Sequence, residues 1–430
     1  MSRFHQHTDT QPAHVTALNL PPNTSCVLVE KRHISIEPIP MPILQPDGVL
    51  VKVIANGICG SDMHVYLCGG IGGRGGYGRT VMGHEAAGEV IAVGEHVTTH
   101  KPGDRVADLV GIAGFADCPQ SNLGFRVDGV PTARMDGVIS VLICAIAVLR
   151  GTTGLSRGML SAPLSRTKIT VVRFFALPAD MAPHIPETVS WEEAGSIQPL
   201  AIGIQIGKRA DLRAHQTVAI FGCGPIGLIT AAVAHAYCAA KIIAFEINPS
   251  RVAFAKEYRS PMTGRPLIDH VYQIEPIPTG DGQVQDAEEQ TPGDAKWEHA
   301  KKRMEAIIQE CGLSAEEGVD RVIEASGAED AMLHGVALCK QGGVFLQVGL
   351  SHIQTHTFPM VAVTNKELDV RGITRYTASC FPSAIDLLSR GVVDLKPLIT
   401  AQFPLSRAKE AFEAVASGKE MKVIIKNQDI

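Results

Sequence analysis

Residues 217–246, with the sequence TVAIFGCGPIGLITAAVAHAYCAAKIIAFE, decide the fold of this chain. A run of β-forming residues at 217–221 leads into the glycine-rich turn GCGPIG, and residues 225–238 then predict a helix with proline in its first turn. Residues 241–246 predict the next strand. A strand, a crossover helix and a second strand in this order indicate two parallel strands of an α/β sheet.

The same apolar run has a second interpretation, since only His235 and Lys241 are ionisable between residues 217 and 245. A run of this length is long enough to cross a bilayer as one helix. The turn Gly222-Cys223-Gly224-Pro225 would break that helix, however, and a strand followed by a buried helix explains the same apolarity. We therefore expect no membrane span here.

The turn carries the pattern GxGxxG between a predicted strand and a predicted helix. Glycine is needed there for the tight turn, for close approach of the backbone to a pyrophosphate and for helix–strand packing. Glu246 ends the next strand, where a carboxylate accepts both ribose hydroxyls and repels a 2′-phosphate, so NAD is favoured over NADP. The alternative is a packing turn with a surface glutamate. The expected cofactor-binding residues of the turn are Gly222, Gly224, Pro225, Ile226 and Gly227.

Outside this stretch the chain has two kinds of pattern. Strand–helix alternation continues towards the C-terminus, with a helix at 249–258, a strand at 319–324, a helix at 330–340 and a strand at 343–348. Residues 25–56 and 86–106 are instead rich in β-formers with turn signals between them. The sequence therefore predicts a β-rich part followed by a parallel α/β part.

Length and composition fit an ordinary globular protein. The 430 residues include 39 basic and 44 acidic side chains, 45% apolar residues and 19% charged ones. We expect two domains, and the near-neutral charge gives no indication of nucleic acid or an acidic membrane as partner. The ten cysteines are scattered without a CxxC pair, so we expect a reducing, cytoplasmic setting.

A second constellation suggests a metal. The sequence GICGSDMH at 57–64 is followed by Gly83-His84-Glu85. The Cys59 thiolate, the His84 imidazole and the Glu85 carboxylate are all zinc ligands, and three protein ligands with one open position is the catalytic arrangement. The alternative is a buried cysteine and a core histidine, and the spacing alone leaves both open.

Taken together, these motifs resemble a known family. GICGSDxH, GHE, the stretch around KPGDRVA, and GCGPIG are similar to the zinc-dependent medium-chain dehydrogenases. The run VAVTNKELDVRGITRY at 361–376 and the C-terminal AFEAVASGKEMKVIIK resemble the polyol branch, which contains sorbitol, xylitol and L-arabinitol dehydrogenases. The resemblance covers roughly residues 25–107 and 173–430.

The resemblance implies an α/β fold with two domains. A β-rich GroES-like catalytic domain would comprise residues 1–198 and 376–430, and a Rossmann domain with a doubly wound parallel sheet would comprise residues 199–375, with the active site between them. It also implies a homo-oligomer, a dimer or a tetramer. The polyol substrate would be a small molecule.

The resemblance further implies roles for individual residues. Cys59, His84 and Glu85 would hold one catalytic zinc, and the turn glycines with Glu246 would hold NAD. The remaining assignments are Ser61 and His64 as a proton relay, Arg375 and Tyr376 as contacts to the polyol or a zinc-bound water, and Arg251 near the adenosine.

Residues 108–172 depart from the family pattern. Many relatives carry four closely spaced cysteines there for a structural zinc, whereas this segment holds only Cys118 and Cys144. We therefore expect no structural zinc. The segment is either a divergent lobe or sequence foreign to the fold, and the lack of turn and strand signals favours the latter.

Gln198 is the second departure, since relatives carry glutamate before Pro-Leu, beside the zinc. An amide hydrogen-bonds a water but supplies neither negative charge nor a base. Either Gln198 is a neutral packing variant, which we favour, or it changes the rate and pH dependence of the reaction.

The leading hypothesis is a zinc- and NAD-dependent polyol dehydrogenase that interconverts a sugar alcohol and its ketose, with xylitol and D-xylulose first and sorbitol or L-arabinitol next. Zinc lowers the pKa of a bound water from about 15.7 to about 7, and an alcohol should respond similarly. One alternative is a zinc alcohol dehydrogenase for another secondary alcohol. The other is a degenerate paralogue that binds NAD without turnover, which Gln198 and the 108–172 segment motivate.

Overall fold

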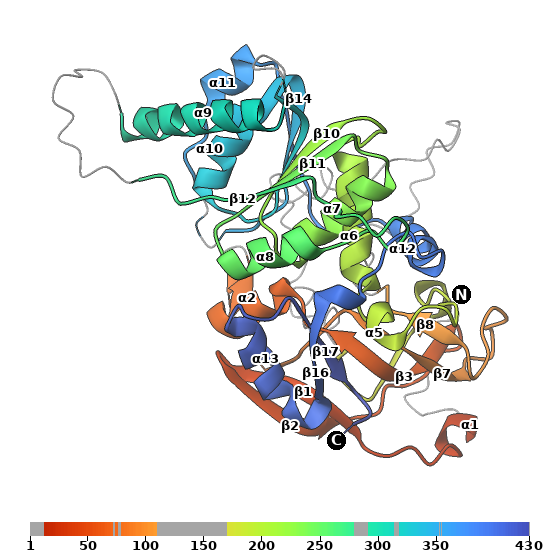
Figure 1. The fold of residues 1–430 in the computed structure, drawn as a ribbon. Helices are drawn as coiled ribbons and strands as arrows, with labels where there is room; N and C mark the ends of the chain where they lie inside the picture. Colours follow the sequence, from red (N-terminus) through yellow and green to blue (C-terminus); the bar gives the residue numbers. More distant parts are fainter. Residues whose placement is uncertain are drawn as a thin grey trace, which may run out of the picture.

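The computed structural model describes residues 13–71, 74–75, 79–109, 170–278, 291–313, 318–351, 353 and 355–429. In this part of the chain, two larger sheets form two lobes that meet around the central helices (Figure 1). Most of the segment 108–172, with Cys118 and Cys144, lies outside the described residues, so the expectation about a structural zinc is not addressed by the structure.

The first sheet is parallel and contains the glycine-rich turn. Its strands run in the order β12 (His270–Gln273), β11 (Lys241–Glu246), β10 (Thr217–Phe221), β13 (Val319–Glu324), β14 (Cys339–Gln347) and β15 (Asp369–Gly372). The helices of this lobe are α7 (Pro225–Ala236), α8 (Pro249–Glu257), α9 (Pro292–Glu310), α10 (Glu329–Leu338) and α11 (Met360–Asn365). The order of the strands reverses between β10 and β13.

The expected α/β fold is confirmed in this lobe, and the run 217–246 folds as strand, turn, helix and strand rather than as one helix. No helix in the described ranges is both long and apolar enough to cross a membrane. Several predicted boundaries differ from the structure, since α7 ends at Ala236 rather than at residue 238 and α8 at Glu257 rather than at residue 258. The largest difference follows α10: the sequence predicts helix to residue 340 and a strand from 343, but α10 ends at Leu338 and β14 begins at Cys339. The Lys366 ammonium donates to the carbonyls of Val336, Ala337 and Cys339 at 2.7–3.1 Å, which ends the helix there.

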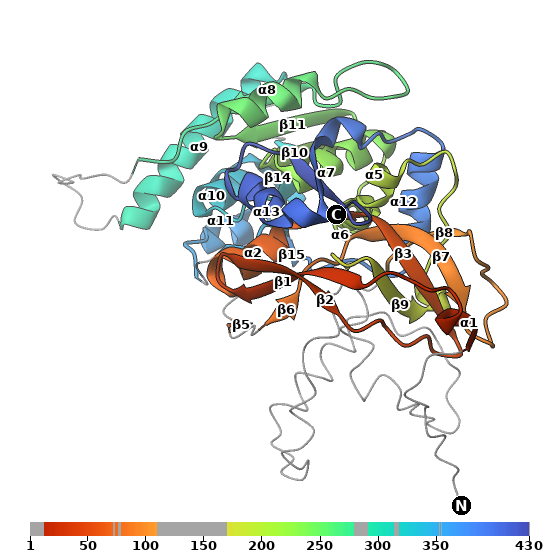
Figure 2. The same cartoon turned by 90° about the horizontal axis from the view of Figure 1, so that it is seen from below.

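The second lobe is built on β-strands, as the sequence predicts. Its main sheet has the order β16 (Ile399–Pro404), β17 (Lys422–Lys426), β3 (Gly48–Gly57), β7 (Ala86–Val93) and β8 (Arg105–Ala107), and β9 (Phe174–Pro178) also pairs with β3. A smaller sheet contains β2 (His33–Ile39), β1 (Asn23–Glu30) and β6 (Thr80–Val81), and β4 (Gly70–Ile71) pairs with β5 (Arg74–Gly75). Strand β17 therefore brings the C-terminal part of the chain beside β3 (Figure 2).

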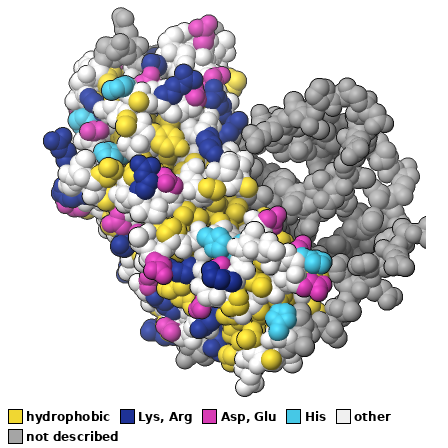
Figure 3. Space-filling model, turned by 90° about the vertical axis from the view of Figure 1, so that its right-hand side faces the viewer, with side chains coloured by type: hydrophobic (Ala, Val, Ile, Leu, Met, Phe, Trp, Pro, Cys, Tyr) yellow, Lys and Arg dark blue, Asp and Glu magenta, His cyan; other side chains and the backbone are white. Residues whose placement is uncertain are grey.

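Short helices connect and cover these sheets. They are α1 (Ala13–Thr16), α2 (Gly60–Cys68), α5 (Trp191–Ala194), α6 (Ile197–Arg209), α12 (Cys380–Ser389) and α13 (Ala408–Ala416), with 3₁₀ turns at Ala179–Met181, Lys396–Leu398 and Leu405–Arg407. Helix α6 packs with α7 and α12 in the largest apolar core, which includes Leu200, Ile204 and Phe381. On the face seen in Figure 3, acidic and basic side chains of the described residues are interspersed rather than separated by sign.

Candidate active site

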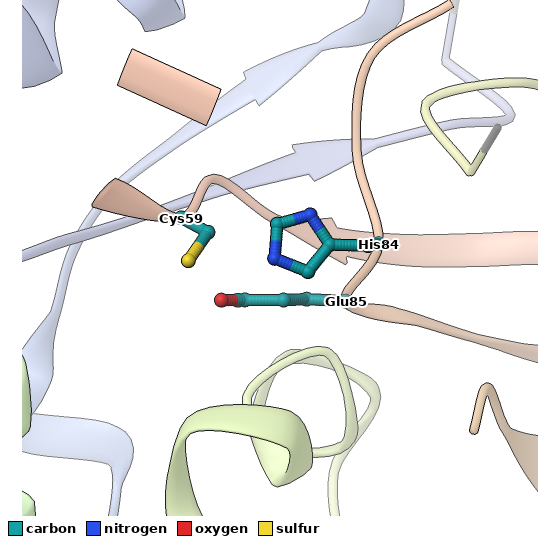
Figure 4. Close-up of side chains that lie close together, drawn as sticks. All are labelled: Cys59, His84 and Glu85. Atoms are coloured by element: carbon teal, nitrogen blue, oxygen red, sulfur yellow. The ribbon is translucent and has the colours of Figure 1, made fainter. Parts of the chain in front are cut away.

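The three expected metal ligands lie together. The ligand atoms of Cys59, His84 and Glu85 are within 4.8 Å of one another, and the three side chains converge on one space (Figure 4). His84 and Glu85 are buried, and Cys59 is partly exposed. Among the described residues, this is the one group of His, Cys, Asp and Glu side chains with the spacing of a metal site.

Antiparallel pairing brings these residues to one sheet edge. Strands β3 and β7 pair with Asn56 opposite Ala86, so the residues just after β3 meet those just before β7. The Gly57 amide donates to the Glu85 carbonyl at 2.9 Å, which continues the ladder by one step. Cys59 is the N-cap of α2, and its own amide donates to Asp62 Oδ2 at 3.1 Å.

Asp62 also orients His84. Its Oδ1 lies 3.3 Å from His84 Nδ1, and Ser61 Oγ lies 3.3 Å from the other ring nitrogen, Nε2. A carboxylate at Nδ1 favours the tautomer with its proton there, which leaves the Nε2 lone pair for a metal. Burial alone lowers the pKa of His84, but Asp62 and Cys59 outweigh it and raise that pKa well above its ordinary value. Metal binding to this site therefore competes with a proton.

The two carboxylate oxygens of Glu85 have different surroundings. Its Oε2 accepts from the Lys422 ammonium, which also donates to the Ile58 carbonyl at 3.0 Å. Its Oε1 is buried and has no hydrogen-bond partner in the part of the chain that the structure describes. A buried oxygen of this kind costs free energy unless a ligand completes it. The thiolate, imidazole and carboxylate are therefore a donor set that fits zinc, with Glu85 Oε1 as the free ligand atom.

Gln198 and Tyr376 are buried beside this group. Gln198 lies in the first turn of α6, and its Oε1 has no hydrogen-bond partner within the described ranges. Burial, together with the Asp108 and Glu85 carboxylates, raises the pKa of Tyr376, while the Gln198 amide acts in the opposite direction. Tyr376 is thus a neutral phenol, and it lies close enough to Asp108, Glu85 and Gln198 for each of them to affect its pKa.

The other two expected catalytic residues are more accessible. Arg375 is exposed and has φ +60°, a left-handed conformation that turns the chain just before the buried Tyr376. His64 is partly exposed and lies one turn after Ser61 in α2, on the same face of that helix.

The backbone of the glycine-rich turn has the tight turn, the close packing and the open approach for which glycines were expected there. Gly222 has φ +98°, and a Cβ on Gly227 would lie 1.8 Å from the Gly222 carbonyl oxygen. A Cβ on Gly224 would meet only Arg251 Nη1, at 3.8 Å. Pro225 and Ile226 then open α7, whose N-terminal N–H groups face the turn.

Glu246 and Arg251 lie at the same turn. Glu246 is buried, and its carboxylate accepts from the amides of Cys223, Ile247 and Asn248 at 2.8–2.9 Å. Burial and Glu246 raise the pKa of the Cys223 thiol to about 12, so this side chain adds no charge to the turn. The expected acid is therefore held in a fixed orientation, with Arg251 at the Gly224 side.

Sequence patterns missed two residues of the site. Asp62 lies inside the quoted GICGSDMH motif, and its position three residues after Cys59 is a capping signal that was available. Lys422 lies 337 residues from Glu85, and no local pattern relates the two.

Comparison with known proteins agrees with this geometry. Residues 45–144 match the family model of the alcohol dehydrogenase GroES-like domain, and residues 225–390 match that of the zinc-binding dehydrogenases. The chain is 33% identical over 408 residues to D-xylulose reductase A of Aspergillus niger, covering 95% of this chain and 97% of that protein. It is 31% identical over 409 residues to D-xylulose reductase A of Aspergillus oryzae (strain ATCC 42149 / RIB 40), covering 95% and 98%.

Solved structures share the fold. L-idonate 5-dehydrogenase from Escherichia coli superposes with a TM-score of 0.67 at 21% identity, covering 94% of this chain and 98% of that chain. 2R,3R-butanediol dehydrogenase from Bacillus subtilis gives 0.66 at 22% identity, with 94% and 99% covered. Fold and donor set thus define a zinc-binding dehydrogenase. The chain belongs to the zinc-dependent medium-chain dehydrogenases, which are oxidoreductases that act on CH–OH groups and use zinc and a nicotinamide cofactor.

Proposed function

We propose that this protein oxidises a sugar alcohol to its ketose with NAD⁺, and reduces the ketose in the reverse direction, with xylitol and D-xylulose as the first pair to test. The two Aspergillus relatives are named D-xylulose reductases, which supports this choice. The observation that carries the proposal is the convergence of Cys59, His84 and Glu85 beside the buried polar side chains of Gln198 and Tyr376. A hydroxyl-rich substrate suits such a pocket better than an apolar alcohol does.

We assign Cys59, His84 and Glu85 as the ligands of one catalytic zinc. Zinc bound there would lower the pKa of the substrate hydroxyl, and bound NAD⁺ would accept the hydride from the carbinol carbon. Asp62 holds His84 in the tautomer that offers Nε2, and Lys422 occupies one oxygen of Glu85 so that the other stays available.

Ser61 and His64 form the proposed route for the hydroxyl proton. Ser61 Oγ lies 3.3 Å from His84 Nε2, the nitrogen that would bind the zinc, so it would be close to a substrate hydroxyl held there. Ser61 accepts this proton as it passes its own towards His64, and His64 exchanges it with solvent, for which an imidazole is suited. Tyr376 and Arg375 orient the remaining hydroxyls of the polyol, and Gln198 hydrogen-bonds water or substrate without taking a proton.

The proposed NAD site lies where the strand order reverses. The pyrophosphate would bind at the residues Gly222, Gly224, Pro225, Ile226 and Gly227, at the N-terminus of α7. Glu246 would accept the adenosine ribose hydroxyls on lone pairs that its three amide donors leave free, with Arg251 nearby.

A substrate and cofactor panel tests this proposal. NADH formation is measured with xylitol, sorbitol, L-arabinitol and 2-propanol, each with NAD⁺ and NADP⁺. We expect turnover with a polyol and NAD⁺ that exceeds turnover with 2-propanol. A preference for 2-propanol would instead identify a dehydrogenase for simple secondary alcohols. NADH binding without turnover of any alcohol would identify a degenerate paralogue, the outcome that Gln198 motivates.

We also propose that two copies associate through the edge of the parallel sheet. Strand β15 ends the strand order, and Val370 in this strand is 47% exposed. Other exposed large apolar side chains precede β15 in the sequence, namely Leu350, Ile353, Met360 and Val361. Unpaired edge strands with apolar side chains favour pairing with another chain. Sedimentation should give a dimer or tetramer, and Val370→Lys should shift it towards the monomer, whereas a monomeric wild type would contradict this assignment.

Two further expectations remain proposals. The domain limits, 1–198 with 376–430 and 199–375, can be tested by limited proteolysis and mass analysis of the fragments. A cytoplasmic location is supported by the eight described cysteines, which form no disulfide with one another. Microscopy of the tagged protein tests the location.

A further inference from the structure

Two loops border the point at which the strand order of the parallel sheet reverses. Strands β10 and β13 are neighbours, with Phe221 opposite Glu324, and their successors lead away in opposite directions. Ligands of open α/β sheets bind in the crevice outside the carboxyl ends of the strands at such a point. By this rule the glycine-rich turn would form one wall of the crevice, and residues 325–328 after β13 would form the other.

The two walls are in contact. The Ala325 amide donates to the Phe221 carbonyl at 2.8 Å, and a Cβ on Gly222 would lie 3.2 Å from the Ser326 nitrogen. A displacement of residues 325–328 would therefore change the space beside the turn that receives the pyrophosphate.

Glu324 holds the second wall in place. Its side chain is 0% exposed, and its Oε1 accepts from the Ser326 amide at 2.8 Å, the Gly327 amide at 2.9 Å and the Ser326 hydroxyl. Its Oε2 accepts from the Gly327 amide at 2.9 Å and from Gln347 Nε2 at 2.6 Å. The carboxylate thus links the ends of β13 and β14 to the loop that follows β13.

The backbone around this carboxylate leaves little freedom. Gly327 has φ +77°, and a Cβ on Gly349 would lie 2.1 Å from the Gly327 nitrogen and 2.7 Å from Glu324 Oε2. The loop is therefore folded tightly over the carboxylate. An amide in place of the carboxylate would have to direct its NH₂ group either at the loop amides or at the Gln347 NH₂, so a donor would face a donor in both orientations.

We infer that Glu324 is a positioning residue for the dinucleotide: its buried carboxylate fixes residues 325–328 as the wall opposite the glycine-rich turn, and so sets the affinity for NAD(H). This inference rests on the proposed NAD site. Glu324 itself is buried beneath the loop and acts through it, so loss of the carboxylate should weaken cofactor binding while the metal ligands stay in place.

The test compares Glu324→Gln with the wild type by titration of NADH fluorescence and by thermal unfolding. A buried donor left without an acceptor weakens the dependent interaction by about tenfold, so we expect the Kd of NADH to rise at least about tenfold. The KM for NAD⁺ should rise more than kcat falls, and the zinc content should not change. If Glu324→Gln does not fold, Gln347→Met, which removes one donor to Oε2, should still raise the Kd by about threefold.

A second variant tests the hydrogen-bond pattern. Glu324→Gln combined with Gln347→Glu places a carboxylate opposite the new NH₂ group and frees the side-chain oxygen at position 324 for the loop amides. We expect this pair to recover most of the NADH affinity, though not all of it, because residue 347 can then no longer donate to the Gly349 carbonyl as Gln347 does at 2.9 Å.

Asp320 provides the matched control. It lies in the same strand at the opposite end, where its Oδ2 accepts from the Thr217 amide at 2.7 Å and the Thr217 hydroxyl at 2.8 Å. Asp320→Asn should lower the unfolding temperature without changing the Kd of NADH. Equal NADH affinity in wild type and folded Glu324→Gln, or equal weakening by Asp320→Asn, would overturn the inference alone. A wild type that does not bind NADH would overturn the proposed NAD site as well.

Discussion

Lys422 and Glu85, one of the three candidate metal ligands, form an ion pair whose side chains are only 5% and 1% exposed. Lys422 comes from β17 and Glu85 precedes β7, and the two strands lie on either side of β3. Gly57 at the end of β3 leaves the space for this pair, since a Cβ there would lie 2.3 Å from Glu85 Oε2 and 2.8 Å from Lys422 Cε. The C-terminal strand thus completes a site that begins at residue 59.

Lys422→Met is expected to destabilise the metal-free protein by about 3–5 kcal/mol, since removal of one partner leaves an uncompensated buried charge. Added zinc should restore part of this loss, because the cation then compensates Glu85. Lys426→Met is the matched control: it lies in the same strand, but its ion pair with Glu192 is 26% exposed on both sides, so its loss should cost under about 1 kcal/mol. Denaturant unfolding of chelator-treated protein checks both, and equal losses would contradict the account.

Two glycines of the turn should separate folding from cofactor binding. Gly227→Ala places a methyl group against the Gly222 carbonyl and should destabilise the protein by about 1–3 kcal/mol, as overpacking does. Gly224→Ala meets only the end of Arg251, so the fold should tolerate it, but the methyl group would stand where the pyrophosphate approaches. Thermal unfolding and NADH titration distinguish them. Unchanged NADH affinity in Gly224→Ala would place the cofactor elsewhere.

Glu246→Ser should shift the cofactor preference towards NADP⁺. The substitution removes a negative charge that repels a 2′-phosphate, and it leaves the amides of Cys223, Ile247 and Asn248 available near Arg251. The ratio of kcat/KM for NADP⁺ to that for NAD⁺ should rise at least about tenfold, since like charges in contact cost more than about 1.4 kcal/mol. Glu257→Gln at the exposed end of α8 is the control and should leave the ratio unchanged.

His334 in α10 predicts a pH dependence of stability. Burial, assisted by Arg303, lowers the pKa of this side chain to about 4, although Asp330 acts in the opposite direction. Above about pH 6.5 the imidazole is neutral in both states. As the pH falls towards 4, the unfolded chain binds the proton first, so the folded state loses stability by about 3 kcal/mol at roughly 1.36 kcal/mol per pKa unit.

His334→Leu removes this proton from the balance. The difference in unfolding free energy between wild type and variant should therefore fall by about 3 kcal/mol from about pH 7 to about pH 4. Urea unfolding across this range measures the difference. A difference that stays constant with pH would show that His334 is not the titrating group.

The parts of the fold that the sequence predicts are those with local signals. Glycine, proline and a run of buried β-formers fix residues 217–246, because a tight turn and a parallel strand need those residue types in order. Strand β12 was not predicted, and its side chains are only partly buried or exposed, so its signal is weak. Helix α9 was also not predicted, although Thr291 and Asp294 form a capping box and Pro292 lies in its first turn, so a local signal was available there. The end of α10 depends on Lys366, which lies 27 residues beyond Cys339.

The site divides in the same way. Residue type and spacing indicate Cys59, His84 and Glu85, because thiolate, imidazole and carboxylate are the ligands that zinc prefers. The side chains that orient them cannot be found so directly. Lys422 reaches Glu85 because β17 and β7 lie on either side of β3, and the two residues are 337 positions apart in the sequence.

Zinc content tests the central claim most directly. Metal analysis of purified protein compares the wild type with Cys59→Ser and with Cys68→Ser, the exposed cysteine at the other end of α2. The account predicts about one zinc per chain in the wild type and in Cys68→Ser, and less than about a tenth of that in Cys59→Ser, because the site then lacks its thiolate. No zinc in the wild type, or equal zinc in all three proteins, would contradict it.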